Sequence, residues 1–258
     1  MPVPAPAWLT ARPFAHRGLH DAASAIVENT YAAAAAAIDH GYAIECDVQI
    51  TGDGEAVVFH DFTLDRLTTV RGSLDAVPLQ ALTAIPLRAT QQRIAPLPAF
   101  LGLVGGRTPL VCEIKSRFDG DLTLAARVAA IARSYAGPLA LKSFDPAIIA
   151  YLQENRAAFG LDDTPLGMVA QASYDDGPAE WARLTAGEKF ALAEFLHFEA
   201  TRPDFLSYGV RDLPHAVPYL CRAGLGLPVL AWTVRDAAQA AIAARWADQI
   251  IFEGWRPA

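Results

Sequence analysis

The stretch AIECDVQITGDGEAVVFHD, residues 43–61, combines a strand pattern with two acids and a His-Asp pair. Glu45 and Asp47 interrupt an apolar run, TGDG is typical of a tight turn, and EAVVFHD predicts the second arm of a β-hairpin. Because side chains alternate across a strand, Glu45 and Asp47 share one face, and Cys46 and Val48 share the other. The first arm is therefore expected to bury an apolar face and to present two carboxylates on the opposite one.

Outward from this hairpin, strand-like runs alternate with helix-like runs. The expected strands lie at 12–18, 42–50, 109–116, 138–144, 165–170, 204–209, 228–234 and 248–254. Helices are expected at 28–41, about 121–136, 146–158, 214–224 and 236–246, and a long loop plus a helix at 171–203. Eight strands that are nearly all followed by helices, in 258 residues, predict a closed (β/α)8 TIM barrel of the α/β class.

Two segments carry more local signals. In the helix at 28–41, Asn29 is a favoured N-cap type and Gly41 a favoured C-terminal residue. Residues 62–97 depart from the strand–helix alternation and contain several Thr and Arg and three prolines. We therefore expect a small insertion at about 62–97, after the second strand, within a single catalytic domain of residues 1–258.

The composition excludes several classes of protein. A net charge of −7 disfavours nucleic acid and anionic membrane surfaces as partners. The three cysteines are far apart and lack zinc-ligand spacing, which is typical of free buried thiols. The first residues, MPVPAPAWLTARPF, contain prolines where a signal peptide has a continuous apolar helix, and no apolar run approaches the roughly 18 residues of a membrane span. These features predict a cytoplasmic protein without a membrane span, and the oligomeric state is open.

A second acidic pattern occurs in the strand PLVCEIKS, residues 109–116, where Glu113 and Lys115 share a face. Three carboxylates, Glu45, Asp47 and Glu113, are then expected at the C-terminal mouth of the barrel, where barrel enzymes hold their active sites. A divalent cation would offset their mutual repulsion, and an all-oxygen ligand set suits Mg²⁺ or Ca²⁺ better than zinc. The alternative is a buried ion network with Lys115, Arg17 or Lys142.

Two histidines and two cations complete the candidate site. His16 is expected at the end of the first strand and His60 at the end of the hairpin arm, so that both reach the same mouth, and a histidine pair suits general acid–base catalysis. Arg17 and Lys115 would form a phosphate clamp, or an ion pair with the acids, and the two roles are compatible. The residues alone predict a metal-assisted enzyme that acts on a phosphate ester.

With these residues in view, the sequence resembles the glycerophosphodiester phosphodiesterase family. The resemblance rests on AHRG (15–18), ENTYAAAAAAIDHG (28–41), IECDVQITGDGEAVVFHDFTLDRLT (44–68) with Gly72, CEIKS (112–116), SFDP (143–146) and LAWTV (230–234). It implies a TIM barrel with an insertion after the HD arm, and hydrolysis of glycerophosphodiesters to sn-glycerol 3-phosphate and an alcohol.

By motif position the resemblance also implies roles for individual residues. His16 and His60 would be the acid–base pair, and the metal ligands would be Glu45, Asp47 and Glu113. The substrate-binding residues would be Arg17, Lys115 and Trp232. Which histidine acts as acid, and whether a cyclic phosphate forms on the way, are both open.

The sequence departs from the family pattern in two places. The last strand continues as IIFEGWRP instead of the common Thr-Asp-x-Pro, so Glu253 and Trp255 are expected to reshape that side of the pocket. The second departure is Lys142, which precedes SF in the fourth strand. It is expected either to contact a phosphate or a carboxylate or to be a partner of Glu113. The alternative functions are a related barrel phospholipase, which acts on lysophospholipids or forms a cyclic phosphate, and a non-catalytic glycerol-phosphate-binding protein.

Overall fold

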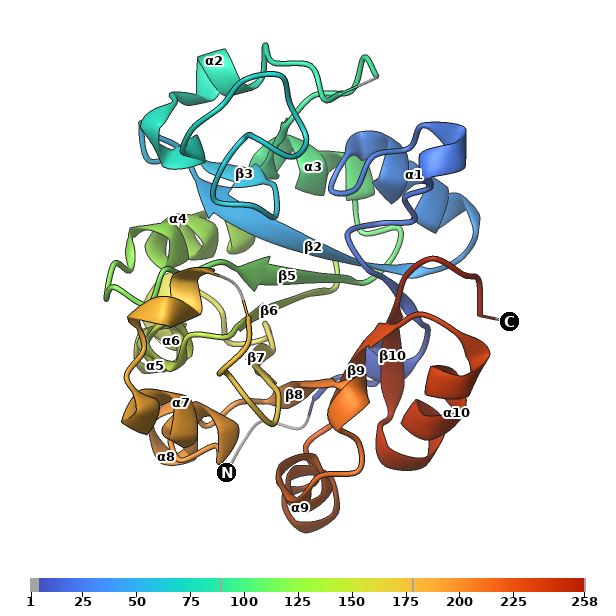
Figure 1. Ribbon diagram of the computed structural model, residues 1–258, viewed down its shortest axis with the longest axis vertical. Coiled ribbons are helices and arrows are strands. Elements are labelled where there is room, and N and C mark those ends of the chain that lie inside the picture. Colours follow the sequence, from blue (N-terminus) through green and yellow to red (C-terminus); the bar gives the residue numbers. More distant parts are fainter. Residues whose placement is uncertain (1–4, 89, 178, 258) are drawn as a thin grey trace. The chain divides into compact units, whose positions relative to one another are not determined.

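The structure is a computed structural model that describes residues 5–88, 90–177 and 179–257 (Figure 1). The described chain divides into two compact units. Unit 2 comprises residues 14–115 and 123–139, and unit 1 comprises the described residues up to Pro13, residues 116–122 and those from Ala140 onward. The start of the predicted N-terminal segment, residues 1–4, lies outside the described residues.

Eight parallel strands form the fold. They are β1 (Phe14–Ala15), β2 (Ala43–Ile50), β5 (Leu110–Ile114), β6 (Leu139–Ser143), β7 (Leu166–Ala170), β8 (Phe205–Gly209), β9 (Val229–Val234) and β10 (Gln249–Phe252). Two short antiparallel strands, β3 (Ala56–Val58) and β4 (Ala95–Pro96), extend from β2. The strand order is β1-β10-β9-β8-β7-β6-β5-β2-β3-β4, and β1 also pairs with β2, so the sheet closes. The predicted (β/α)8 barrel is confirmed.

Helices follow most of the parallel strands. The α-helices are α1 (Tyr31–Asp39), α2 (Leu79–Leu82), α3 (Leu97–Val104), α4 (Thr123–Ala132), α5 (Pro146–Glu154), α6 (Arg156–Phe159), α7 (Ala186–Ala193), α8 (Phe198–Thr201), α9 (Ala216–Leu225) and α10 (Ala237–Trp246). The 3-10 turns are η1 (Ala7–Thr10), η2 (Ala22–Ser24), η3 (Leu74–Ala76), η4 (Ala179–Arg183) and η5 (Val210–Asp212). None of the described helices combines the length and the apolar character needed to cross a membrane.

The start of α1 differs from the prediction. The N-cap is Thr30, whose hydroxyl accepts a hydrogen bond from the Ala33 backbone N–H, and the predicted cap Asn29 has a positive φ of 57°. The side chain of Asn29 instead bonds Asp47 on β2. Asn29 is therefore displaced from the cap by a tertiary contact, which a local capping rule does not include.

The α3 helix was not predicted, because Pro98 and Gly102 lie within its eight residues. The proline occupies the first turn, where the helix needs no donor from it. Leu97, Phe100, Leu101 and Val104 are buried on one side of α3. Phe100 also stacks on Tyr31 of α1, with ring centroids 6.3 Å apart. Burial of this apolar face compensates for the poor helix propensity of the segment.

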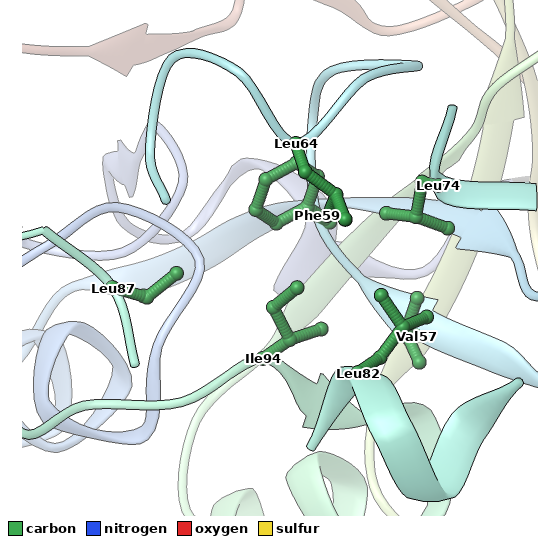
Figure 2. Close-up of a cluster of buried hydrophobic side chains, with 7 residues drawn as sticks. All are labelled: Val57, Phe59, Leu64, Leu74, Leu82, Leu87 and Ile94. Atoms are coloured by element: carbon green, nitrogen blue, oxygen red, sulfur yellow. The ribbon is translucent and has the colours of Figure 1, made fainter. Parts of the chain in front are cut away.

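Residues 62–97, where the sequence analysis expects a small insertion, pack with the hairpin arm around one apolar cluster. Seven buried side chains make up this cluster, which we call the insertion core: Val57, Phe59, Leu64, Leu74, Leu82, Leu87 and Ile94 (Figure 2). In Figure 2, Phe59 and Leu64 face each other, and Val57 lies beside Leu82 of α2. The cluster joins the loops of the insertion to the hairpin arm that ends at His60.

Leu82→Ala should lower the free energy of unfolding by about 2–5 kcal/mol, because Leu82 is fully buried in the insertion core and its loss leaves a cavity. Urea unfolding followed by circular dichroism measures the change. Leu225→Ala is the control, since Leu225 is 52% exposed and its truncation should change the value by less than about 0.5 kcal/mol. Equal effects of the two substitutions would contradict the assignment of the insertion core.

Candidate active site

The register of β2 against β5 brings three acids together in unit 2. Asp47 pairs with Glu113, and Cys46 pairs with Cys112, across the two parallel strands. On one face the Cys46 and Cys112 sulfurs lie 3.3 Å apart. On the other, one carboxylate oxygen from each of Glu45, Asp47 and Glu113 lies within 4.8 Å of the others, and all three residues are buried. The alternation predicted for both strands therefore produces an acidic cluster.

Two cations lie against this acidic cluster. The Lys115 ammonium is 2.7 Å from Glu113 Oε1 and 3.0 Å from Asp47 Oδ1. The Arg17 guanidinium donates a 2.7 Å hydrogen bond from Nη1 to Glu28, and its Nε lies 3.4 Å from Asp47 Oδ2. Both cations thus form ion pairs with the acids, which is one of the two compatible roles that the sequence analysis expects for them.

Burial and charge act in opposite directions on the ionisation of these groups. Burial acts to raise the pKa of Asp47, but the positive charges of Lys115, His60, Arg17 and His16 outweigh it and hold that pKa well below its usual range. Burial acts to lower the pKa of Lys115, and the carboxylates of Asp47 and Glu113 outweigh it and raise that pKa. Both groups are therefore charged at neutral pH, and each depends on the other for its charged state.

The turn after β1 presents His16 to the same acids. His16 Nε2 lies 4.0 Å from Glu45 Oε2, and the backbone N–H of Arg17 donates a 3.1 Å hydrogen bond to the same oxygen. Arg17 has a positive φ of 57°, which costs a non-glycine residue free energy. At Gly18 an added Cβ would lie 2.8 Å from the Ala33 backbone, so no larger residue fits. Glu45 therefore stabilises a strained turn that carries both His16 and Arg17.

The end of the hairpin arm holds His60. Gln49 on β2 donates a 2.9 Å hydrogen bond from Nε2 to the His60 carbonyl oxygen. The Nδ1 atom of the imidazole lies 2.8 Å from Asp61 Oδ1. The carboxylate of Asp61 accepts two further hydrogen bonds from Arg66. This contact orients the ring through one of its two nitrogens, Nδ1.

Sequence reasoning placed neither Asn29, which it assigned to a helix cap, nor Glu28 in the candidate site. Asn29 donates a 2.9 Å hydrogen bond from Nδ2 to Asp47 Oδ2, and its Oδ1 accepts one from the Asp47 backbone N–H. Glu28 bonds the guanidinium groups of both Arg17 and Arg66. Both residues belong to the ENT motif, and that motif was the only signal that pointed to them.

The remaining candidates lie in unit 1. Trp232 on β9 packs edge-on against Phe144, with ring centroids 5.4 Å apart, and its Nε1 has no hydrogen-bond partner among the described residues. Lys142 is buried in β6. At the departure that follows the last strand, Glu253 lies 3.4 Å from the Arg235 guanidinium, and Trp255 donates from Nε1 to the Val234 carbonyl oxygen. Both residues therefore have contacts with β9 or the residue that follows it.

Unit 1 also contains a separate pocket of about 310 Å³, beside the N-terminus of α5 and the helix α7. His197 lines it, with its ring 4.6 Å from that of Phe195 and its buried Nε2 without a hydrogen-bond partner among the described residues. Burial lowers the pKa of His197 to about 4. The residue is therefore a neutral, structural histidine at physiological pH.

The acidic cluster fits a divalent cation. Among the described residues, the side chains that meet here with metal-ligand spacing are three buried carboxylates, which form the hard oxygen set that Mg²⁺ and Ca²⁺ prefer. Lys115 neutralises part of the negative charge, and Arg17 extends from Asp47 toward Glu28. Chemically, the arrangement can bind a metal ion and an anionic group together, with imidazoles close by for proton transfer.

Lys115→Met should lower the free energy of unfolding by about 3 kcal/mol in the presence of a chelator, because Asp47 and Glu113 then lose their buried counter-charge. Saturating Mg²⁺ should restore part of that loss by binding the folded state. Urea unfolding with and without Mg²⁺ measures both effects. Lys189→Met, on α7, is the control and should change the value by less than about 0.5 kcal/mol. Equal losses in the two variants would contradict the role of Lys115.

His197→Gln should make the stability less sensitive to acid. The folded protein holds His197 neutral down to about pH 4, whereas the unfolded chain protonates it near 6.5, so acidification between these values favours unfolding. Over that interval the free energy of unfolding should fall by roughly 1–3 kcal/mol more in the wild type than in the variant. Urea unfolding at pH 7 and pH 5 compares the two. Parallel losses in both proteins would show that His197 is protonated in the folded state.

Comparison with known proteins gives consistent matches. The sequence model of the glycerophosphoryl diester phosphodiesterase family matches residues 16–105. A glycerophosphodiester phosphodiesterase from Caldanaerobacter subterraneus subsp. tengcongensis is 37% identical over 110 residues, which are 40% of this chain and 44% of the relative. The match thus spans less than half the length of that relative.

Solved structures extend the likeness to the whole fold. An Oleispira antarctica phosphodiesterase, solved in complex with the product sn-glycerol-3-phosphate, aligns with a TM-score of 0.73 and 21% identity over 93% of this chain and 91% of that one. A glycerophosphodiester phosphodiesterase from Thermotoga maritima aligns with a TM-score of 0.67 and 23% identity over 93% and 92%. The family match begins directly after β1 and contains β2, the hairpin and the insertion, and therefore Glu45, Asp47 and both histidines. The chain is therefore similar to the glycerophosphoryl diester phosphodiesterase family over residues 16–105, and it shares the fold of these solved structures.

Proposed function

We propose that the protein hydrolyses glycerophosphodiesters to sn-glycerol 3-phosphate and an alcohol, with a divalent cation, Mg²⁺ or Ca²⁺, held by Glu45, Asp47 and Glu113. The observation that carries this proposal is the meeting of these three buried carboxylates with Lys115 and Arg17 in unit 2. The family match and the product named for the Oleispira antarctica structure support the choice of substrate.

Charge complementarity supports a phosphodiester as the bound group. A bound divalent cation would supply Lewis-acid stabilisation of the phosphate oxygens. Arg17 and Lys115 add two positive charges beside the acidic cluster, and a guanidinium is well suited to contact two phosphate oxygens at once. The extra negative charge that builds up at phosphorus during the reaction would be stabilised by these cations.

Two imidazoles serve the proton transfers in this proposal. His16 and His60 both lie near enough to Asp47 for their positive charges to lower its pKa. One histidine removes a proton from the attacking hydroxyl, either the glycerol 2-OH or water. The other protonates the alcohol oxygen as its bond to phosphorus breaks. Trp232, on β9, is proposed from the family motif to contact the substrate.

His16→Ala and His60→Ala should each lower kcat on glycerophosphocholine by at least about 100-fold, because each removes one proton-transfer group. Glu113→Gln should leave the fold intact and weaken activation by the cation, as titrated with Mg²⁺, Ca²⁺ or Mn²⁺ after chelation. His40→Ala, at the exposed end of α1, is the matched control and should keep kcat.

Near-normal turnover in both histidine variants, or full activity after chelation, would overturn the proposal. Phosphorus NMR of the products separates the alternatives, since a phosphate monoester supports hydrolysis and an accumulated cyclic phosphate supports a lyase. Turnover of lysophospholipids in preference to glycerophosphocholine would indicate a phospholipase. Binding of glycerol phosphate without any turnover, in the presence of the cations, would indicate a non-catalytic binding protein.

A further inference from the structure

A continuous series of alternating charges connects the acidic cluster to His60. It begins at Asp47, passes to Arg17 and Glu28, and then continues through Arg66 and Asp61 to the imidazole. Each step except the first is a hydrogen bond of 2.7 to 2.9 Å. Arg66, in the middle of this series, belongs to the insertion. Within the described part of the chain, its side chain bonds Glu28 and Asp61, and it reaches the acidic cluster and the imidazole only through these two residues.

The guanidinium of Arg66 binds two carboxylates at once. Its Nη1 and Nη2 donate to the two oxygens of Glu28, at 2.9 and 2.7 Å. Its Nε and Nη2 donate to the two oxygens of Asp61, at 2.6 and 2.9 Å. Two bidentate pairs on one planar group define its orientation, and with it the relative positions of Glu28 and Asp61.

The loop that carries Arg66 is itself held in place. Leu64 is buried in the insertion core against Phe59, the residue before His60 (Figure 2). Arg88 donates hydrogen bonds from its guanidinium to the carbonyl oxygens of Asp65 and Thr68. The insertion therefore supports Arg66 from both sides along the chain.

A surface ion pair is the simpler interpretation of Arg66, whose side chain is 45% exposed. Exposed pairs contribute little to stability. The partners differ, however, because Glu28 and Asp61 are only 13% and 21% exposed, and each holds a residue of the proposed active site. Glu28 bonds Arg17, and Asp61 bonds His60. The exposed arginine is thus the link between two mostly buried carboxylates.

We propose that Arg66 is a positioning residue for the proposed reaction. Through Asp61 it holds the His60 imidazole in the tautomer with its proton on Nδ1, which leaves Nε2 to exchange a proton with the substrate. Through Glu28 it holds Arg17 beside Asp47. The insertion then serves catalysis by carrying a guanidinium that positions one acid–base residue and one phosphate-binding residue together. This inference rests on the proposed function for its kinetic consequence, but its structural part is independent of it.

The test compares Arg66→Met and Arg66→Lys with the wild type and with Arg71→Met. Arg71 is an exposed arginine of the same insertion, so Arg71→Met makes the same change of charge outside the series. The His60 tautomer is read from long-range proton–nitrogen NMR of the substrate-free protein in mildly alkaline buffer. Steady-state kinetics on glycerophosphocholine give kcat and KM for the same samples.

Arg66→Met should convert His60 from the Nδ1-protonated tautomer to a mixture, and should lower kcat by about 10- to 100-fold with a smaller change in KM. Arg66→Lys should retain only part of the Nδ1-protonated tautomer and only part of the wild-type kcat, because an ammonium cannot make two bidentate pairs. Added methylguanidinium should partly restore kcat in Arg66→Gly, since the site is accessible from solvent. Arg71→Met should match the wild type in both measurements.

A second measurement keeps the test decisive if Arg66→Met folds poorly. Asp61→Asn should produce the same tautomer mixture, and Asp61→Asn combined with Arg66→Lys should cost less than the sum of the two single effects, because both act through one contact. An unchanged His60 tautomer in Arg66→Met, with or without a fall in kcat, would overturn the inference. If the wild type turned over no glycerophosphodiester, the proposed function would fail, and the NMR comparison would still decide the role of Arg66.

Discussion

The ion pair between Lys115 and the two acids Asp47 and Glu113 is the interaction on which the rest of the site depends. A buried carboxylate without a counter-charge is unfavourable by several kcal/mol, and here two of them lie side by side on neighbouring strands. Lys115 satisfies both at distances of 3.0 and 2.7 Å. A slip of β2 by one residue would turn the acids to the opposite face and expose the cysteines to the site. The strand register and the electrostatics of the site therefore constrain each other.

Around this ion pair, apolar and polar contacts of unit 2 have different roles. The insertion core places the backbone of the hairpin end and of the loop that carries Arg66. Hydrogen bonds then position residues of the candidate site, as Gln49 does for the His60 backbone and Asn29 does for Asp47. Arg17 has a strained backbone with a positive φ, and the hydrogen bond from its N–H to Glu45 stabilises this turn. Such conformations persist at functional sites when their surroundings stabilise them.

Local patterns predicted the fold well and the site in part. The period of two in the strands and the capped helical runs were sufficient for the eight parallel strands, because both signals depend only on neighbouring residues. The same reasoning was wrong for Asn29, which a local rule assigns to a helix cap and which instead bonds Asp47, 18 residues away. It also passed over α3, whose helix depends on burial of its apolar face more than on propensity.

The sequence by itself determined the barrel alternation, the placement of acids on one strand face, and the acids, histidines and cations from which a candidate site could be proposed. Only the tertiary structure decided how those side chains are oriented. The contact between Glu28 and Arg66 joins residues 38 apart, and no periodicity or capping rule relates positions at that separation. The physical reason is that periodicity reports which face a side chain takes, whereas a hydrogen bond depends on the distance between two folded segments.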